Sequence, residues 1–287
     1  MLRDFLFFRP FKKCVTFISE TRTNKMNPQN FWKKYEFAVN QTLLFKAGFV
    51  EVFVKHISNG WLINSRVADQ PNEELQVEEV EGFDDDSNVF HFQTGKSYDL
   101  IVVPALPNKA VVFRNNKVIK IGAGELANLN FRIPLDIQFY FQEIKEENLL
   151  IELPLQRLSD TWFGEADNGE PAFSIGSNYD KEFSEINAMP WEAVAPVEIN
   201  NNTTGVFDLQ RLILRVEDFS LFLKNKQLLT NHVAIEFRGP EHAGSVNLSV
   251  KKEIHGQKPL QLAKPRNEVG RNLLRKSFFF IKNIYQS

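Results

Sequence analysis

The segment from Leu129 to Phe141 alternates between apolar and mostly polar side chains. Its odd-numbered positions are all apolar: Leu129, Phe131, Ile133, Leu135, Ile137, Phe139 and Phe141. Its polar even-numbered positions are Asn130, Arg132, Asp136 and Gln138. A period of two puts the apolar side chains on one face of a β-strand, whereas a helix would spread them around its surface. The segment therefore predicts a strand with one buried face, divided near Pro134, because proline cannot donate a hydrogen bond in mid-sheet.

Short strand-like runs separated by turns follow one another along most of the 287 residues. Asn59-Gly60, Asn115-Asn116 and Asn225-Lys226 are predicted as tight turns, since Asn and Gly tolerate positive φ. The pattern favours an all-β fold of two packed antiparallel β-sandwich units, residues 30–153 and 154–255, the second with long loops.

Charge is distributed unevenly. Residues 1–25 carry six Lys/Arg against two Asp/Glu, and residues 251–287 carry nine against two. Because the whole chain has a net charge of −2, residues 26–250 carry −13. An acidic body argues against nucleic acid binding, and the basic ends are candidates for contact with an acidic partner or an anionic membrane. Residues 1–29 are predicted as a basic extension, disordered or helical, and Met1 and Met26 are both candidate start residues.

Residues 265–285 predict a C-terminal amphipathic helix. Val269, Leu273, Phe280 and Ile284 recur at helical spacing, and Pro265 suits the first helical position. Three roles stay open for this helix: docking on the body, lying on an anionic membrane, or packing on a helix of a membrane-protein partner. The residues predicted to make the membrane or partner contact are Arg271, Arg275, Lys276, Phe279 and Lys282.

The cysteine and histidine content indicates in which cellular compartment the protein works and which cofactors it could bind. Cys14 is the single cysteine, which excludes an intramolecular disulfide framework and fits a cytoplasmic protein. If the C-terminal segment binds a membrane, we expect the protein at the periphery of the inner membrane. No run reaches the roughly 18 apolar residues of a membrane span. The five histidines never approach metal-ligand spacing, so we predict no metal and no cofactor.

Two local patterns resemble sites of chemistry. Gly122–Ala127 matches the Gly-x-Gly-x-x-Ala dinucleotide fingerprint, but that fingerprint needs a following helix, and the period-two run follows instead. We therefore interpret it as a turn. Asp160 and Glu165 flank Trp162, and with Trp191 they suggest a carbohydrate-binding or glycoside-active site as the alternative. Since no catalytic motif is found, the leading hypothesis is a non-enzymatic binding or accessory protein.

Several segments together resemble a largely archaeal family, the domain of unknown function 432. The matching stretches are Val102–Pro107 with Val111–Phe113, Gly122–Glu125 before Ile133–Leu135, Leu158–Gly164 before Gly169, and Asn201–Gly205 leading into Arg211–Val216. The resemblance covers roughly residues 30–250 and leaves both basic ends outside it. It implies no catalytic motif to transfer. Some members are encoded beside small-conductance mechanosensitive channels, which implies a membrane-proximal accessory role.

Overall fold

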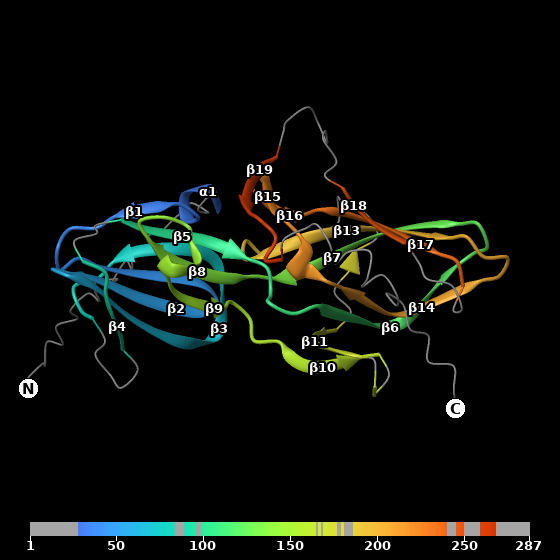
Figure 1. Ribbon diagram of the computed structural model, residues 1–287, viewed down its shortest axis with the longest axis horizontal. Helices are drawn as coiled ribbons and strands as arrows, with labels where there is room; N and C mark the ends of the chain where they lie inside the picture. Colours follow the sequence, from blue (N-terminus) through green and yellow to red (C-terminus); the bar gives the residue numbers. More distant parts are fainter. Residues whose placement is uncertain are drawn as a thin grey trace, which may run out of the picture.

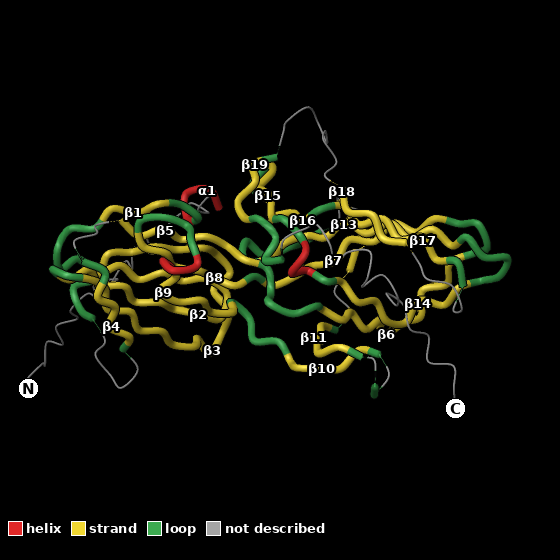
Figure 2. Tube along the Cα trace, in the orientation of Figure 1, coloured by secondary structure: helices red, strands yellow, loops and turns green. Residues whose placement is uncertain are grey.

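The computed structural model describes most of the chain between residues 28 and 267. The described ranges are 28–83, 89–95, 99–164, 166–167, 169–176, 179–180, 186–239, 245–249 and 259–267. Strands dominate them, beside one short helix, α1 (Pro28–Phe31), and two single turns of 3-10 helix, Glu146–Asn148 and Val216–Asp218 (Figure 2). The all-β prediction is confirmed. No helix in these ranges is long and apolar enough to cross a membrane.

The molecule is elongated, with two lobes placed end to end (Figure 1). The first lobe holds two sheets, ordered β1-β5-β8-β9 and β2-β3-β4. Their strands are β1 (Lys34–Glu36), β2 (Thr42–Ile57), β3 (Gly60–Glu79), β4 (Phe90–Gln93), β5 (Asp99–Ala105), β8 (Asp136–Phe141) and β9 (Leu149–Pro154). All pairings within these two sheets are antiparallel.

The second lobe holds a sheet ordered β10-β11-β6-β14 and a larger sheet built around β7 and β13. The first of these comprises β6 (Val111–Ile121), β10 (Ser159–Phe163), β11 (Glu170–Ile175) and β14 (Phe207–Leu214). The larger comprises β7 (Leu126–Pro134), β12 (Tyr179–Asp180), β13 (Glu192–Asn201), β15 (Leu221–Lys224), β16 (Gln227–Thr230), β17 (His232–Phe237), β18 (Ser245–Ser249) and β19 (Leu260–Ala263). Here β11 runs parallel to β6, and both β16 and β17 run parallel to β13, so these sheets are mixed and not purely antiparallel.

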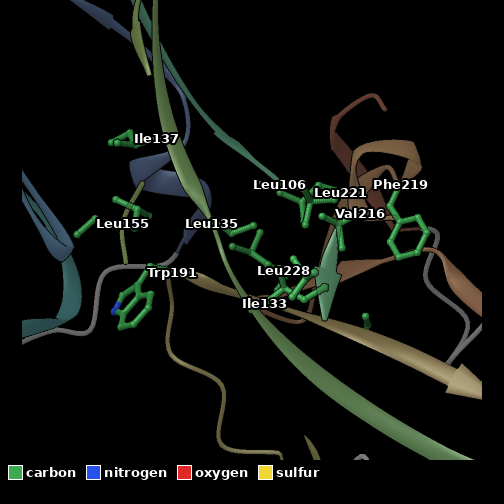
Figure 3. Packing of buried hydrophobic residues seen from close by; sticks show 14 of the residues in the cluster. Leu106, Ile133, Leu135, Ile137, Leu155, Trp191, Val216, Phe219, Leu221 and Leu228 are labelled. Carbon is green, nitrogen blue, oxygen red and sulfur yellow. The ribbon is translucent and has the colours of Figure 1, made fainter. Parts of the chain in front are cut away.

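The chain passes between the lobes three times within the described residues. It crosses at Leu106 after β5, at Leu135 between β7 and β8, and at Leu155 after β9. All three leucines are buried, and Figure 3 shows Leu135 and Leu155 on the side of Trp191 and Leu106 next to Leu221, in one apolar cluster that continues into both lobes. Strand pairing also joins the ranges 30–153 and 154–255, because β7 pairs with β13. The division of the chain into units at residue 153 stays a prediction.

The alternating segment forms β7 and β8. Its apolar side chains from Leu129 to Phe139 are at most 2% exposed, so the predicted buried face is confirmed. Pro134 ends β7, and Leu135 separates it from β8. The sequence pattern thus placed both the strands and the break between them.

The predicted glycine turn is also confirmed. Gly124 has φ +70°, and the Glu125 N–H donates to the Gly122 carbonyl at 3.2 Å. Strand β7 follows directly, so the helix that a bound dinucleotide needs is absent at this position. The Asn225-Lys226 turn is confirmed as well, with φ of 48° and 68° between β15 and β16.

The predicted Asn115-Asn116 hairpin is wrong. Strand β6 continues through both residues and pairs with β14 on either side of them, at Arg114 and Ile119. The asparagines instead begin a bulge, in which the register with β14 shifts between Arg211 and Leu209. The Asn115 side chain donates to the Leu209 carbonyl across this bulge at 3.4 Å.

The predicted helix 265–285 does not begin where the sequence placed it. Pro265–Asn267 are not helical, because Arg266 is held by the body through hydrogen bonds. Residues 268–285 lie outside the described residues, as do residues 1–27 of the predicted N-terminal extension.

Candidate functional site

A cluster of polar side chains lies where the two lobes meet. On β8 it includes Asp136, Gln138 and Tyr140, which alternate with Ile137 and Phe139 and therefore point away from the core of the first lobe. On β9 it includes Glu152, the cross-strand neighbour of Gln138. The last member is Arg266, just after β19. We call Asp136, Gln138, Tyr140, Glu152 and Arg266 the junction cluster, and residues 259–267 the strap.

Arg266 links the strap to both lobes. Its Nε donates to the Leu106 carbonyl at 2.7 Å, and its Nη1 donates to Glu152 Oε2 at 3.1 Å. Its Nη2 donates to Asp136 Oδ2 at 3.2 Å and to Glu152 Oε1. Its backbone N–H donates at 2.9 Å to the carbonyl of Glu217, which belongs to the second lobe. One residue therefore joins β8, β9, the crossing at Leu106 and the second lobe.

The remaining polar groups of the cluster also bond to one another. Gln138 Nε2 donates to Glu152 Oε2 at 2.7 Å, and the Tyr140 hydroxyl donates to Gln138 Oε1 at 3.1 Å. Glu152 thus receives hydrogen bonds from both Arg266 and Gln138. These charge-assisted bonds fix the orientation of its carboxylate.

The pKa values of the two carboxyl groups in the cluster are shifted in opposite directions. Burial, followed by the hydrogen bond and the charge of Glu152, raises the pKa of Asp136 from 3.8 to about 7, although the charge of Arg266 opposes the rise. Burial would also raise the pKa of Glu152, but the hydrogen bonds from Arg266 and Gln138 outweigh it and lower that pKa. Below about pH 7 the pair therefore holds one proton, on Asp136, and Glu152 carries the charge that balances Arg266.

A pocket of about 710 Å³ opens beside the junction cluster. One wall is polar and carries Gln138, Tyr140, Glu152 and Arg266. The apolar wall comes from β5, β15, the strap and nearby turns, and Figure 3 shows three of its side chains, Leu106, Phe219 and Leu221, close together. The rest of the lining is Val103, Ala105, Ile144, Lys145, Glu146, Leu149, Gln261, Leu262, Ala263, Lys264 and Pro265. Both lobes and the strap contribute to this pocket.

The two tryptophans singled out from the sequence have different surroundings. Trp191 is 4% exposed, its Nε1 donates to the Asn72 carbonyl at 3.0 Å, and its ring contacts Phe49. Trp162 lies on the edge strand β10 and is 47% exposed. A surface platform made of both rings is therefore not formed.

The structure describes only some of the other residues that the sequence predicted as site residues. Asp160 lies on β10 and is bonded to Lys109 Nζ at 2.9 Å. Glu165 lies outside the described residues, as do Arg271, Arg275, Lys276, Phe279 and Lys282. Within the described ranges, no group of three or more His, Cys, Asp or Glu side chains could hold a metal ion.

Sequence reasoning missed the junction cluster. The alternation that predicted the buried face also placed Asp136 and Gln138 together on the opposite face, and this was the available signal. Arg266 gave no such signal, because it lies 114 residues from Glu152 and 130 from Asp136.

Fold and site together define a class of protein: a two-lobed, all-β protein with a polar cluster and a mixed pocket at the lobe junction. The chain belongs to the DUF432 family, described as a protein of unknown function, whose model matches residues 31–282. The match spans both lobes, the strap and the whole junction cluster. No curated protein and no solved structure matches the chain.

Proposed function

We propose that this chain is a non-enzymatic binding protein whose ligand occupies the junction pocket. The observation that carries the proposal is that the pocket takes its walls from both lobes and from the strap. Its volume of about 710 Å³ lies within the range of small-molecule sites, about 300–1,000 Å³. A ligand bound there would contact all three parts and stabilise them relative to one another.

The junction cluster supports a binding role over a catalytic one. Glu152 already accepts hydrogen bonds from Arg266 and Gln138, and Arg266 uses its guanidinium on Glu152, Asp136 and Leu106. Groups committed to one another in this way form a rigid wall that orients a ligand.

The test blocks the pocket with a bulky side chain. Leu262→Trp fills it from the strap, and Leu260→Trp is the matched control, since Leu260 is on the same strand, 50% exposed and outside the lining. Fragments of acidic, basic and neutral character are screened by ligand-observed NMR. We expect hits that bind the wild type and Leu260→Trp but not Leu262→Trp. Equal binding to all three proteins would refute the pocket as the site.

We further propose that the basic C-terminal segment brings this protein to an anionic membrane surface, at the cytoplasmic face. Residues 251–287 carry nine basic and two acidic side chains, against −13 for residues 26–250. The test is co-sedimentation with anionic and with neutral vesicles, using the full chain and a chain ending at Asn267, which keeps Arg266. We expect binding only to anionic vesicles and only with the tail. Equal binding by the shortened chain would remove the membrane part of the proposal.

The exposed Trp162 ring favours one alternative function, carbohydrate binding. Its indole, 47% exposed on an edge strand, could stack on a sugar face. A glycan array with the wild type and Trp162→Ala tests this idea. Sugar binding that survives the substitution, or no binding at all, would count against it.

The proposal includes a sandwich arrangement within each lobe. In the first lobe it is supported by Phe45 of β2, whose ring meets Phe139 of β8 edge-to-face at 5.2 Å. In the second lobe Phe113 of β6 meets Phe131 of β7 at 4.5 Å. Each contact joins two different sheets.

A further inference from the structure

We propose that the junction pocket selects a ligand carrying a protonated amine or guanidinium on an apolar body. This inference rests on the proposed pocket function and adds the chemical class of its ligand.

The first reason is that hydrogen-bond donors on the polar wall are already used. The Arg266 nitrogens Nε, Nη1 and Nη2 all donate to protein oxygens, and the Tyr140 hydroxyl donates to Gln138. Gln261 Nε2 donates to Ser220 Oγ at 3.2 Å. A ligand offering only acceptors would meet few donors on this wall.

The second reason is that acceptor capacity remains. A carboxylate has about four lone-pair sites, and Glu152 receives two bonds from Arg266 and one from Gln138. Asp136 donates to the fourth site only while it keeps its proton, below about pH 7, so that this site is free at higher pH. The Tyr140 oxygen and Gln261 Oε1 are further acceptors in the lining, and Glu146 adds a second carboxylate. The wall therefore favours a ligand that donates hydrogen bonds.

The third reason is charge. Among the cations of the lining, Arg266 is matched by Glu152 and Asp136, and Lys145 Nζ lies 2.7 Å from Glu143 Oε2. Residues 26–250, which form most of both lobes, carry −13, a field that attracts cations. Lys264 on the strap is the lining residue that opposes a cationic ligand most directly.

The apolar wall of the pocket determines the chemical character of the rest of the ligand. Val103, Leu149, Phe219, Leu221 and Leu262 line the pocket together, and side chains of this kind bind a hydrocarbon or aromatic body. We therefore expect the ligand to place a cationic group next to Glu152 and an apolar body against the strap.

Three probes with the same apolar body test the head group. They are 4-phenylbutylamine, 4-phenylbutan-1-ol and 4-phenylbutanoate, titrated by calorimetry into the full chain at pH 8. We expect the amine to bind at least tenfold more tightly than the alcohol, and the carboxylate to bind most weakly. Lys264→Gln should tighten amine binding about threefold, since it removes a like charge. Lys226→Gln, in the exposed β15–β16 turn, is the matched control and should change nothing.

The outcomes separate this inference from the proposed function. Binding of all three probes within threefold of one another, or tightest binding of the carboxylate, would overturn the cation preference while leaving a pocket that Leu262→Trp blocks. Binding of no probe overturns the cation preference too, and the fragment screen then decides the pocket function alone. Amine binding unaffected by Leu262→Trp would place the amine elsewhere and overturn the inference.

Discussion

Replacing Asp136 by Asn should make the protein less sensitive to pH between about pH 5 and pH 8. In the native state Asp136 keeps its proton up to about pH 7, whereas the unfolded chain releases it near pH 3.8. Unfolding therefore releases a proton in this range, and the contribution of Asp136 to stability falls as pH rises. Asparagine keeps an acceptor for Arg266 and a donor for Glu152 but does not titrate.

The magnitude follows from the two pKa values. The difference between 3.8 and about 7 corresponds to about 4 kcal/mol at ~1.4 kcal/mol per pH unit, with Asp136 13% exposed. About 3 kcal/mol of this falls between pH 5 and pH 8. Glu152 does not add to this pH dependence, because its pKa is lowered and therefore lies below the range from pH 5 to pH 8.

The assay is urea unfolding of the wild type and of Asp136→Asn at several pH values from 5 to 8. We expect the free energy of unfolding of the variant, relative to wild type, to rise by about 3 kcal/mol over this range. Asp160→Asn makes the same chemical change at a side chain 76% exposed, and should stay within about 0.5 kcal/mol of wild type. A variant-to-wild-type difference that is flat with pH, or that falls, would refute the reasoning.

Three further substitutions test the packing around the junction and the turns. Arg266→Gln should cost about 2–3 kcal/mol, because it leaves the half-buried Glu152 carboxylate without its cation, and should speed hydrogen exchange in the strap; normal exchange there would contradict the role of Arg266. Gly48→Ala should cost about 1–3 kcal/mol in thermal unfolding, since φ is +52° and a Cβ would lie 2.5 Å from the Leu155 carbonyl oxygen, whereas Gly82→Ala meets nothing within 4 Å and should be neutral. Asn201→Ala should cost about 3 kcal/mol in urea unfolding, because its buried amide donates to the Ile121, Gly122 and Gly205 carbonyls, and the exposed neighbour Asn202→Ala is the control.

The parts of the fold that local patterns encode were predictable. The Leu129–Phe141 alternation predicted β7, β8 and the break at Pro134, because the alternation of a half-buried strand can be recognised from consecutive residues alone. Asn225-Lys226 gave a turn for the same local reason. The Asn115-Asn116 prediction failed because turn preference is local, while flanking strands decided the outcome.

The site could not be predicted, because its members meet only in the folded chain. Arg266 was assigned to a helix on its neighbours in sequence, although its partners lie more than 100 residues away. Trp162 and Trp191 were both candidates for a binding platform from the sequence, yet one is 47% exposed and the other 4%. Burial of a single aromatic ring depends on which distant strands arrive beside it.

The three crossings between the lobes have a consequence for how the chain is made. Strands β6 and β7 leave the ribosome before their partners β13 and β14, and β13 begins about 60 residues after β7 ends. At ~5–20 residues per second, the edge of β7 stays unpaired with β13 for roughly 3–12 s. Neither lobe can be produced by a single cut of the gene, since each takes strands from both sides of the other. The two lobes can therefore be exchanged or duplicated only as a pair.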